Sequence, residues 1–190
     1  MNRAINAYDE NPENAADARK VLEPVLHTPA YASALTATTV GHAHIDTGWL
    51  WPVRGTIRKC ARSFSSQLML IDEYPEYIFG ASAAQHYAFI KENYPGLYEK
   101  IRKAVAAGRW EIQGGMWVEC DTNIPSGESL IRQCLYGQKY WKEKFGCEVR
   151  MCWLPDVFGL TAALPQIMKG CGIKYFMNAK ITWQYNGGDP

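Results

Sequence analysis

A chain of 190 residues, of which 47% are hydrophobic and 21% charged, has room for one domain with a substantial core. Its 20 basic and 19 acidic residues nearly cancel, which argues against a nucleic-acid-binding surface and against a polybasic membrane-binding surface. The polar N-terminus lacks the apolar core of a signal peptide, and the chain has no run of about 18 apolar residues. We therefore expect a cytoplasmic protein that does not contact membranes.

The six cysteines form no CxxC pair, and most of them fall in apolar or periodic segments. This distribution predicts reduced, buried thiols rather than a disulfide framework or a zinc cluster. The seven Trp and eleven Tyr residues fit a well-filled core, but they also fit a carbohydrate-binding surface, because an indole face stacks on sugar C–H groups. Composition alone does not decide between these two interpretations.

The first 35 residues differ from the rest of the chain. Ala15–Glu23 is predicted to form a short helix that Pro24 ends. We therefore expect residues 1–35 to be a leader or linker from a preceding helical segment, and residues 36–190 to be the main domain.

Strand and helix patterns alternate through the main domain. Strands are predicted at Leu35–Ile45, Tyr77–Ala81, Trp110–Gly114, Val149–Leu154 and Lys174–Met177. Helices are predicted from Pro52 through Ile71 and at Ala83–Asn93, Gly96–Ala107, Gly127–Phe145 and Ala162–Lys169. This alternation indicates an α/β fold with parallel strands, built as an open doubly wound sheet or as a β/α barrel. In both folds, functional residues are expected at the carboxyl ends of the strands.

The end of the first predicted strand carries ligand-type residues. Side chains at alternate positions of a strand share a face, so His42, His44 and Asp46 are predicted to lie on one side. Imidazole nitrogens and carboxylate oxygens suit zinc or a similar divalent ion. The alternative is a pair of core histidines beside a helix-capping aspartate. Gly41–His44 does not resemble GxGxxG, which disfavours a nucleotide-binding sheet.

Two further strand ends carry carboxylates. Asp156 follows the fourth predicted strand and is a candidate metal ligand, with a turn or helix-capping role as the alternative. After the third predicted strand, the paired glycines 114–115 lead into a loop with Trp117, Glu119 and Asp121. This loop suits acid–base chemistry or substrate binding, and an ordering role for its carboxylates is the alternative.

The motifs His-x-His-x-Asp-x-Gly-Trp, Gly-Gly-x-Trp-Val-Glu-x-Asp, Pro-Ser-Gly-Glu-Ser-Leu-x-Arg-Gln and Trp-x-Pro-Asp-x-Phe-Gly occur in that order. In this order and spacing they resemble the retaining α-mannosidases of glycoside hydrolase family 38, and most of all their cytosolic and bacterial branch. The resemblance runs from about Thr39 to the end of the chain.

The resemblance implies a (β/α)7 barrel, of which residues 36–190 would form the N-terminal part, truncated after about five strands. It implies metal-dependent retaining hydrolysis of terminal α-mannosides through a covalent glycosyl-Asp intermediate. The expected substrate is an α-mannoside oligosaccharide, and the expected cofactor is a divalent metal, either zinc or cobalt. We expect the full-length protein to be a homo-oligomer.

The resemblance also implies residue roles. His44 and Asp46 would be metal ligands, and Asp156 would be both a ligand and the catalytic nucleophile. The candidate substrate-binding residues are Trp49, as a wall of the sugar pocket, Lys180 and Asp121. A further His ligand and the general acid are expected beyond Pro190, because neither His27 nor His86 is a convincing substitute. The 190 residues alone are therefore expected to bind metal weakly and to turn over little.

Two other functions fit part of the pattern. A metal-dependent polysaccharide deacetylase also places His and Asp at strand ends, where its metal activates water. That activity does not explain the motifs around Trp117 and Asp156. The second alternative is a non-catalytic carbohydrate-binding fragment that keeps the pocket without the chemistry.

Overall fold

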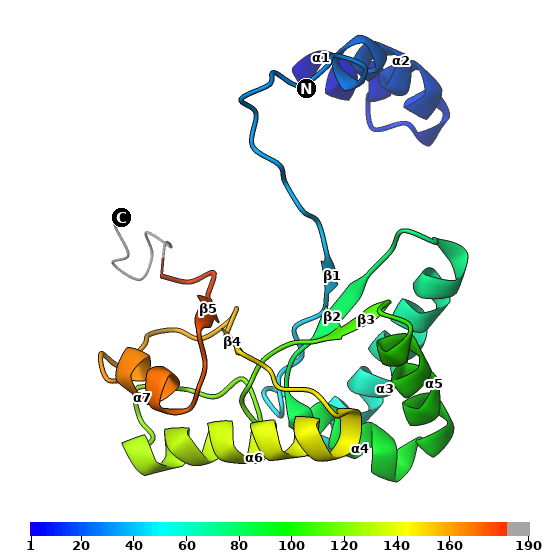
Figure 1. Cartoon of the computed structure of the whole chain (residues 1–190). Helices are drawn as coiled ribbons and strands as arrows, with labels where there is room; N and C mark the ends of the chain where they lie inside the picture. Colours follow the sequence, from blue (N-terminus) through cyan, green and yellow to red (C-terminus); the bar gives the residue numbers. More distant parts are fainter. Residues whose placement is uncertain (182–190) are drawn as a thin grey trace. The chain divides into compact units, whose positions relative to one another are not determined.

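The computed structural model describes residues 1–181, and the chain divides into two units, Met1–Thr39 and Val40–Pro190 (Figure 1). This division lies slightly beyond the predicted boundary at residue 35. No helix in the described part of the chain combines the length and apolar character needed to cross a membrane.

In the first unit, helix α1 (Asn2–Tyr8) contacts helix α2 (Ala15–Leu26), and the short 3-10 helix η1 (Pro12–Asn14) joins them. The sequence patterns missed α1, whose seven residues include only one buried side chain. The prediction that Pro24 ends α2 is wrong, because Pro24 lies inside the last turn. A proline so near the C-terminus removes a single helical hydrogen bond. Its own carbonyl accepts a hydrogen bond from Thr28 Oγ1 at 2.8 Å.

The second unit alternates strands and helices. The strands are β1 (Gly41–His42), β2 (Phe79–Ala81), β3 (Trp110–Ile112), β4 (Met151–Trp153) and β5 (Tyr175–Met177). The helices are α3 (Val53–Glu73), α4 (Ala84–Asn93), α5 (Pro95–Ala106), α6 (Gly127–Phe145) and α7 (Leu164–Gly170). The α3, α4 and α5 helices contact one another beside the first sheet, and α5 packs on β3 (Figure 1).

The strands form two small parallel sheets, ordered β1-β2-β3 and β4-β5. The prediction of an α/β fold with parallel strands is confirmed. Just beyond β3, the Gly115 N–H donates to the carbonyl of Met151 in β4 at 2.7 Å, so the chain after the first sheet runs beside the second. Neither sheet closes on itself within residues 1–181, and the (β/α)7 barrel stays a prediction.

The first predicted strand, Leu35–Ile45, is wrong in extent, because only Gly41 and His42 pair with β2. A segment rich in Thr and Val forms a strand only where it can pair with a neighbouring strand and pack one face against the core. Leu35 is 98% exposed, so it has no such face. The ligand-type residues after His42 consequently lie on a loop and not on the strand itself.

Several aromatic side chains fill the core. Phe64 and Phe79 lie edge-on to Trp110, and Tyr87 lies edge-on to Trp141. Trp110 Nε1 donates to the hydroxyl of Tyr87 at 2.8 Å, which satisfies the buried indole N–H. All six cysteines are free thiols, as their spacing predicts.

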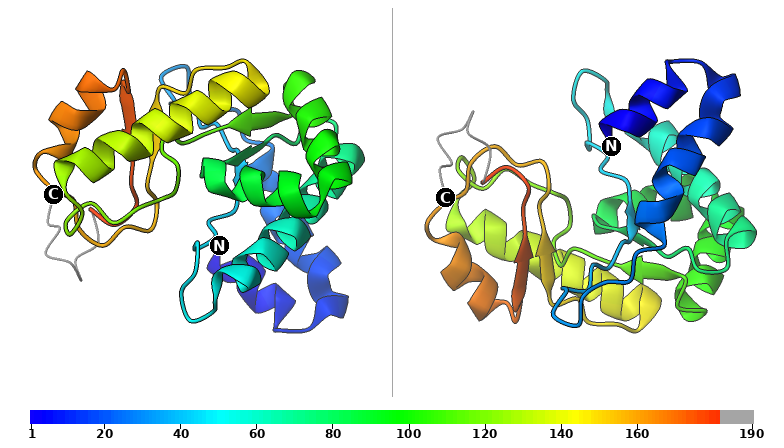
Figure 2. Two further views of the ribbon diagram at one scale, coloured as in Figure 1. Left: turned by 90° about the horizontal axis from the view of Figure 1, so that it is seen from below. Right: turned by 90° about the horizontal axis from the view of Figure 1, so that it is seen from above.

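Helix α6 matches its predicted bounds, because strong signals mark both of its ends. The Ser126 side chain accepts from the Ser129 N–H, and Gly146 ends the helix in the left-handed conformation. The helix extends from α7 to α4 and contacts both of these helices (Figure 2). Its buried Gly137 lies against the backbone of Gly115 and Met116.

Replacing Gly137 with Ala is expected to destabilise this contact. The added Cβ would lie 2.5 Å from the Gly115 carbonyl oxygen and 2.6 Å from Met116 C. Overpacking of this kind costs about 1–3 kcal/mol, which outweighs the roughly 1 kcal/mol that Ala gains in helix propensity. Hydrogen exchange of peptides spanning 114–119 should become faster in Gly137→Ala. The matched control is Gly170→Ala, whose Cβ meets nothing within 4 Å. Equal exchange rates in both variants would contradict this packing.

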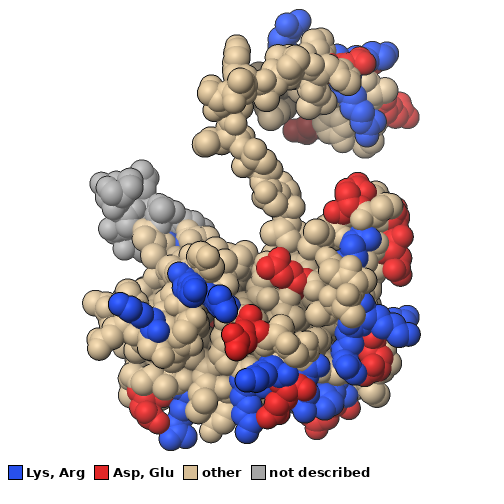
Figure 3. All heavy atoms as spheres, in the orientation of Figure 1, with Lys and Arg blue, Asp and Glu red and all other residues tan. Residues whose placement is uncertain are grey.

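The surface carries both signs of charge. On the face shown in Figure 3, Lys and Arg side chains lie among Asp and Glu side chains over the second unit. Several oppositely charged neighbours on the helices form ion pairs, such as Arg132 with Glu128 and Lys139 with Glu143.

Candidate metal centre and active site

Three side chains from two strand ends converge. His44 and Asp46 follow β1, and Asp156 follows β4. One potential ligand atom of each side chain lies within 4.8 Å of the others. His44 Nε2 is 3.2 Å from Asp46 Oδ1 and 3.4 Å from Asp156 Oδ2. The structure therefore brings together, at the carboxyl ends of the strands, the three residues that the family resemblance implies as metal ligands.

The donor set of this group fits a divalent ion. One imidazole nitrogen with two carboxylate oxygens is a combination that zinc accepts, and catalytic zinc sites keep a position open for substrate. All three side chains are partly exposed, so an ion and a substrate can reach them.

Lys180 lies against the candidate nucleophile. Its Nζ is 2.7 Å from Asp156 Oδ1, and only 11% of its side chain is exposed. Asn178 positions this segment by accepting the backbone N–H of Lys180 and by donating to the Leu154 carbonyl at 2.6 Å. Lys180 Nζ also lies 4.7 Å from the centre of the Phe158 ring. The arrangement places a fixed positive charge beside the Asp156 carboxylate.

Trp49 lies on the loop that follows Asp46, with 66% of the residue exposed. Its ring meets that of Trp51 edge-on, with centroids 5.3 Å apart. The buried hydroxyl of Thr56 organises this loop, because it accepts from the Gly48 N–H and from Trp51 Nε1 and donates to the Asp46 carbonyl. Sequence reasoning missed Thr56, since a single Thr in a helical pattern carries no functional signal.

Glu119 contacts the other side of the His44 ring. Its carboxylate forms hydrogen bonds with His44 Nδ1 and with the hydroxyl of Ser82. The bond to Glu119 is the largest cause that raises the pKa of His44 to about 9, while burial acts in the opposite direction. The sequence left Glu119 open between an acid–base role and an ordering role. In the structure the Glu119 carboxylate contacts the His44 ring, which favours the ordering role.

Asp121 and His42 lie outside the group. Asp121 is exposed, and its Oδ1 accepts the backbone N–H groups of Asn123 and Ile124 at 2.8 and 2.9 Å. Its substrate-binding role stays a prediction. The His42 ring lies 5.0 Å from the ring of Trp153, and burial lowers the pKa of His42. The β1 strand ends at His42, and His42 is not one of the three residues whose possible ligand atoms converge.

A buried histidine supports the loop after Asp46. His86 Nε2 is 2.8 Å from Thr47 Oγ1. Burial, and then the charge of His44, lower the pKa of His86 to about 4. His86 is therefore a neutral imidazole that holds the loop, and it does not belong to the metal-type group.

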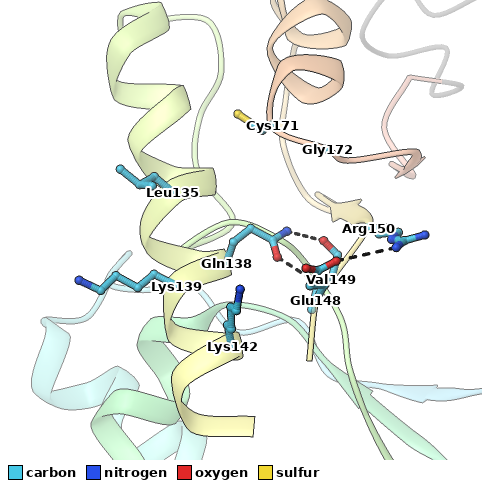
Figure 4. Close-up of a pocket in the computed structure, with 9 residues that line it drawn as sticks. All are labelled: Leu135, Gln138, Lys139, Lys142, Glu148, Val149, Arg150, Cys171 and Gly172. Atoms are coloured by element: carbon cyan, nitrogen blue, oxygen red, sulfur yellow. Dashed lines mark hydrogen bonds and ion pairs between the residues drawn. The ribbon is translucent and has the colours of Figure 1, made fainter. Parts of the chain in front are cut away.

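A surface hollow lies between α6 and the segments that precede β4 and β5 (Figure 4). Gln138 crosses one side of it and forms hydrogen bonds with the backbone N–H and carbonyl of Val149. Because Val149 precedes β4 and Asp156 follows it, this hollow lies at the amino ends of the strands. In parallel α/β folds that end usually serves stability, and the Gln138 contacts fit such a role.

A comparison with protein-family models matches residues 34–187 to the Glycosyl hydrolases family 38 N-terminal domain. The chain belongs to glycosyl hydrolase family 38. The family match covers both strand ends that carry the His44–Asp46–Asp156 group.

Similar curated proteins are α-mannosidases. The chain is 43% identical to human Alpha-mannosidase 2C1 over 190 residues, which are 100% of this chain and 18% of that protein. It is 50% identical to Alpha-mannosidase G of Dictyostelium discoideum over 144 residues, or 76% of this chain and 13% of that protein. The chain thus spans less than a fifth of the length of these relatives.

A solved structure shares the fold. The crystal structure of an alpha-mannosidase from Enterococcus faecalis V583 matches with a TM-score of 0.66 and 27% identity, over 73% of this chain and 16% of that one. A 4-alpha-glucanotransferase from Thermococcus litoralis matches with a TM-score of 0.54 at 19% identity, which is a likeness of fold alone.

Proposed function

We propose that this chain supplies the metal centre and the nucleophile of a retaining α-mannosidase. The observation that carries the proposal is the convergence of His44, Asp46 and Asp156 at the carboxyl ends of β1 and β4. The names of the relatives support α-mannosides as the substrate class. Homo-oligomeric assembly and a cytoplasmic location stay predictions.

Asp156 is the proposed nucleophile. One of its carboxylate oxygens attacks the anomeric carbon, and the bond from that carbon to the leaving oxygen breaks as a general acid protonates it. Water then cleaves the glycosyl ester and restores the carboxylate. Lys180 Nζ, 2.7 Å from Asp156 Oδ1, forms an ion pair that holds the carboxylate in place.

The metal-binding residues would be His44, Asp46 and Asp156. A zinc or cobalt ion bound there would supply a positive charge that fixes vicinal hydroxyls of the mannose ring. Trp49 offers its exposed indole as a wall for the sugar.

Neither carboxyl of the loop after β3 is assigned as the general acid. Within residues 1–181, Glu119 is bound to His44 and Ser82, and Asp121 accepts two backbone N–H groups. We expect the acid and a further His ligand to come from another part of the complete protein. A retaining mechanism requires that acid about 5 Å from Asp156.

Removal of the metal from the complete protein is expected to lower hydrolysis of an aryl α-mannoside by at least about 100-fold, because the ion contributes several kcal/mol. Zinc or cobalt should restore the rate, and magnesium should not, because it prefers an oxygen-only, octahedral shell. The measurement is the rate of aryl release before and after chelation, with metal content followed by mass spectrometry. Full activity of a metal-free preparation would refute the metal centre.

A carbohydrate-binding fragment and a deacetylase predict different results. Neither would form a covalent adduct with a slow fluorinated mannoside, and a deacetylase would release acetate from an acetylated sugar polymer. Family membership supports the glycosidase over both alternatives.

A further inference from the structure

We propose that Glu119 is a positioning residue that fixes the orientation and tautomer of His44. This inference rests on the proposed function, because it concerns how His44 presents its ligand nitrogen. Metal-binding histidines commonly donate their second ring N–H to a carboxylate, which orients the ring and raises its basicity. Glu119 lies where such a carboxylate is needed.

The two nitrogens of His44 face different partners. Nδ1 points to Glu119, whereas Nε2 points to Asp46 at 3.2 Å and Asp156 at 3.4 Å. A metal ion bound at Nε2 would need the lone pair of that nitrogen, so the remaining ring proton would lie on Nδ1, where the Glu119 carboxylate can accept it. The lone pair of Nε2 is then directed at the space that the three ligand atoms share.

The Glu119 carboxylate is itself held on both oxygens. Oε1 accepts from the Ser82 hydroxyl, Oε2 contacts His44 Nδ1, and only 7% of the side chain is exposed. Both oxygens are therefore engaged before a substrate arrives. This geometry suits a group that acts through His44 and not one that touches the sugar.

The loop that carries Glu119 is attached to two helices. On α4, Gln85 donates its backbone N–H to the Trp117 carbonyl at 3.0 Å and accepts from Trp117 Nε1 at 2.9 Å. On α6, Gln133 accepts the Val118 N–H at 3.0 Å. These contacts fix the backbone immediately before Glu119 and so fix the carboxylate.

Gly114 allows the same loop to begin against Ser82. Its φ of +74° is favoured only by glycine, and a Cβ there would lie 2.8 Å from Ser82 Cβ. The approach brings the Ser82 hydroxyl into the position where it donates to Glu119. His44 is thus held by a connected set of residues: Gly114 lets the loop approach Ser82, Ser82 donates to Glu119, and Glu119 contacts the His44 ring.

The test compares Glu119→Gln with Glu128→Gln in the complete protein. Glu128 is an exposed carboxylate on α6 that pairs with Arg132, so it is a matched control away from the site. Zinc affinity is measured by competition with a chromophoric chelator, and the site geometry by the visible absorption of the Co²⁺-loaded protein. Glu119→Gln should weaken zinc binding by roughly 10- to 100-fold and alter the Co²⁺ spectrum, and Glu119→Asp should recover part of the affinity. Glu128→Gln should match the unmodified protein.

Ser82→Ala provides a second test that keeps the Glu119 charge. Loss of the donor to Glu119 should weaken zinc binding by about 3- to 10-fold. This variant also serves if Glu119→Gln fails to fold.

The outcomes separate the two proposals. If His44→Ala loses zinc while Glu119→Gln and Ser82→Ala bind it as tightly as the unmodified protein with an unchanged Co²⁺ spectrum, the positioning role is overturned and the metal centre remains. If His44→Ala itself binds zinc normally, the metal centre is refuted, and the role of Glu119 is refuted with it.

Discussion

Replacing Asp156 with Asn is expected to lower kcat for an aryl α-mannoside by about 10⁴-fold or more, because the variant keeps the size of the side chain but removes the nucleophile. The amide oxygen can still accept from Lys180, so the surroundings of the residue should change little. The rate is measured in the complete protein at saturating zinc, so that weaker metal binding does not mimic the loss of the nucleophile.

The control for this substitution is Asp72→Asn, an exposed position in α3. It should leave kcat unchanged. A slow fluorinated mannoside should also add the mass of one sugar to the peptide that contains Asp156. Label on a different carboxyl group, or an Asp156→Asn variant within tenfold of the unmodified rate, would remove Asp156 from the role of nucleophile.

Replacing His44 with Ala is expected to remove the bound metal ion. The loss of one of three ligands in this group should weaken zinc binding by more than about 100-fold and should abolish most hydrolysis. The measurement is zinc content per protein after dialysis, followed by the rate of aryl mannoside hydrolysis with and without added zinc.

His42 is the matched control, since it is an imidazole two positions away whose ring packs on Trp153. His42→Ala should lose packing but retain zinc. If both variants lose the ion equally, or both retain it, the distinction that the structure draws between the two histidines is wrong.

The sequence predicts the alternation of strands and helices well where local signals are strong. The bounds of α6 agree at both ends because Ser126 caps the helix and Gly146 terminates it. The predicted strand at Leu35–Ile45 is mostly wrong. A strand forms only where a neighbouring strand is present to pair with it, and only Gly41 and His42 pair with β2. Helix α1 is too short to produce a clear periodic pattern.

The members of the candidate site are predictable to the extent that they lie at strand ends. Position and residue type pointed to His42, His44, Asp46 and Asp156. The family resemblance narrowed the ligands to the last three, and the structure brings those three together. The contact between Glu119 and His44 joins residues 75 positions apart, so no local pattern indicates which ring nitrogen the carboxylate meets. No sequence pattern indicates that the Thr56 hydroxyl donates to the Asp46 carbonyl and so orders the loop after Asp46.

The most direct test of the metal centre is a crystal structure of the complete protein with anomalous scattering recorded at the zinc edge. We predict one peak within about 2.0–2.2 Å of His44 Nε2 and of an oxygen from each of Asp46 and Asp156. A zinc peak bound elsewhere, with these three side chains turned away from it, would contradict the account.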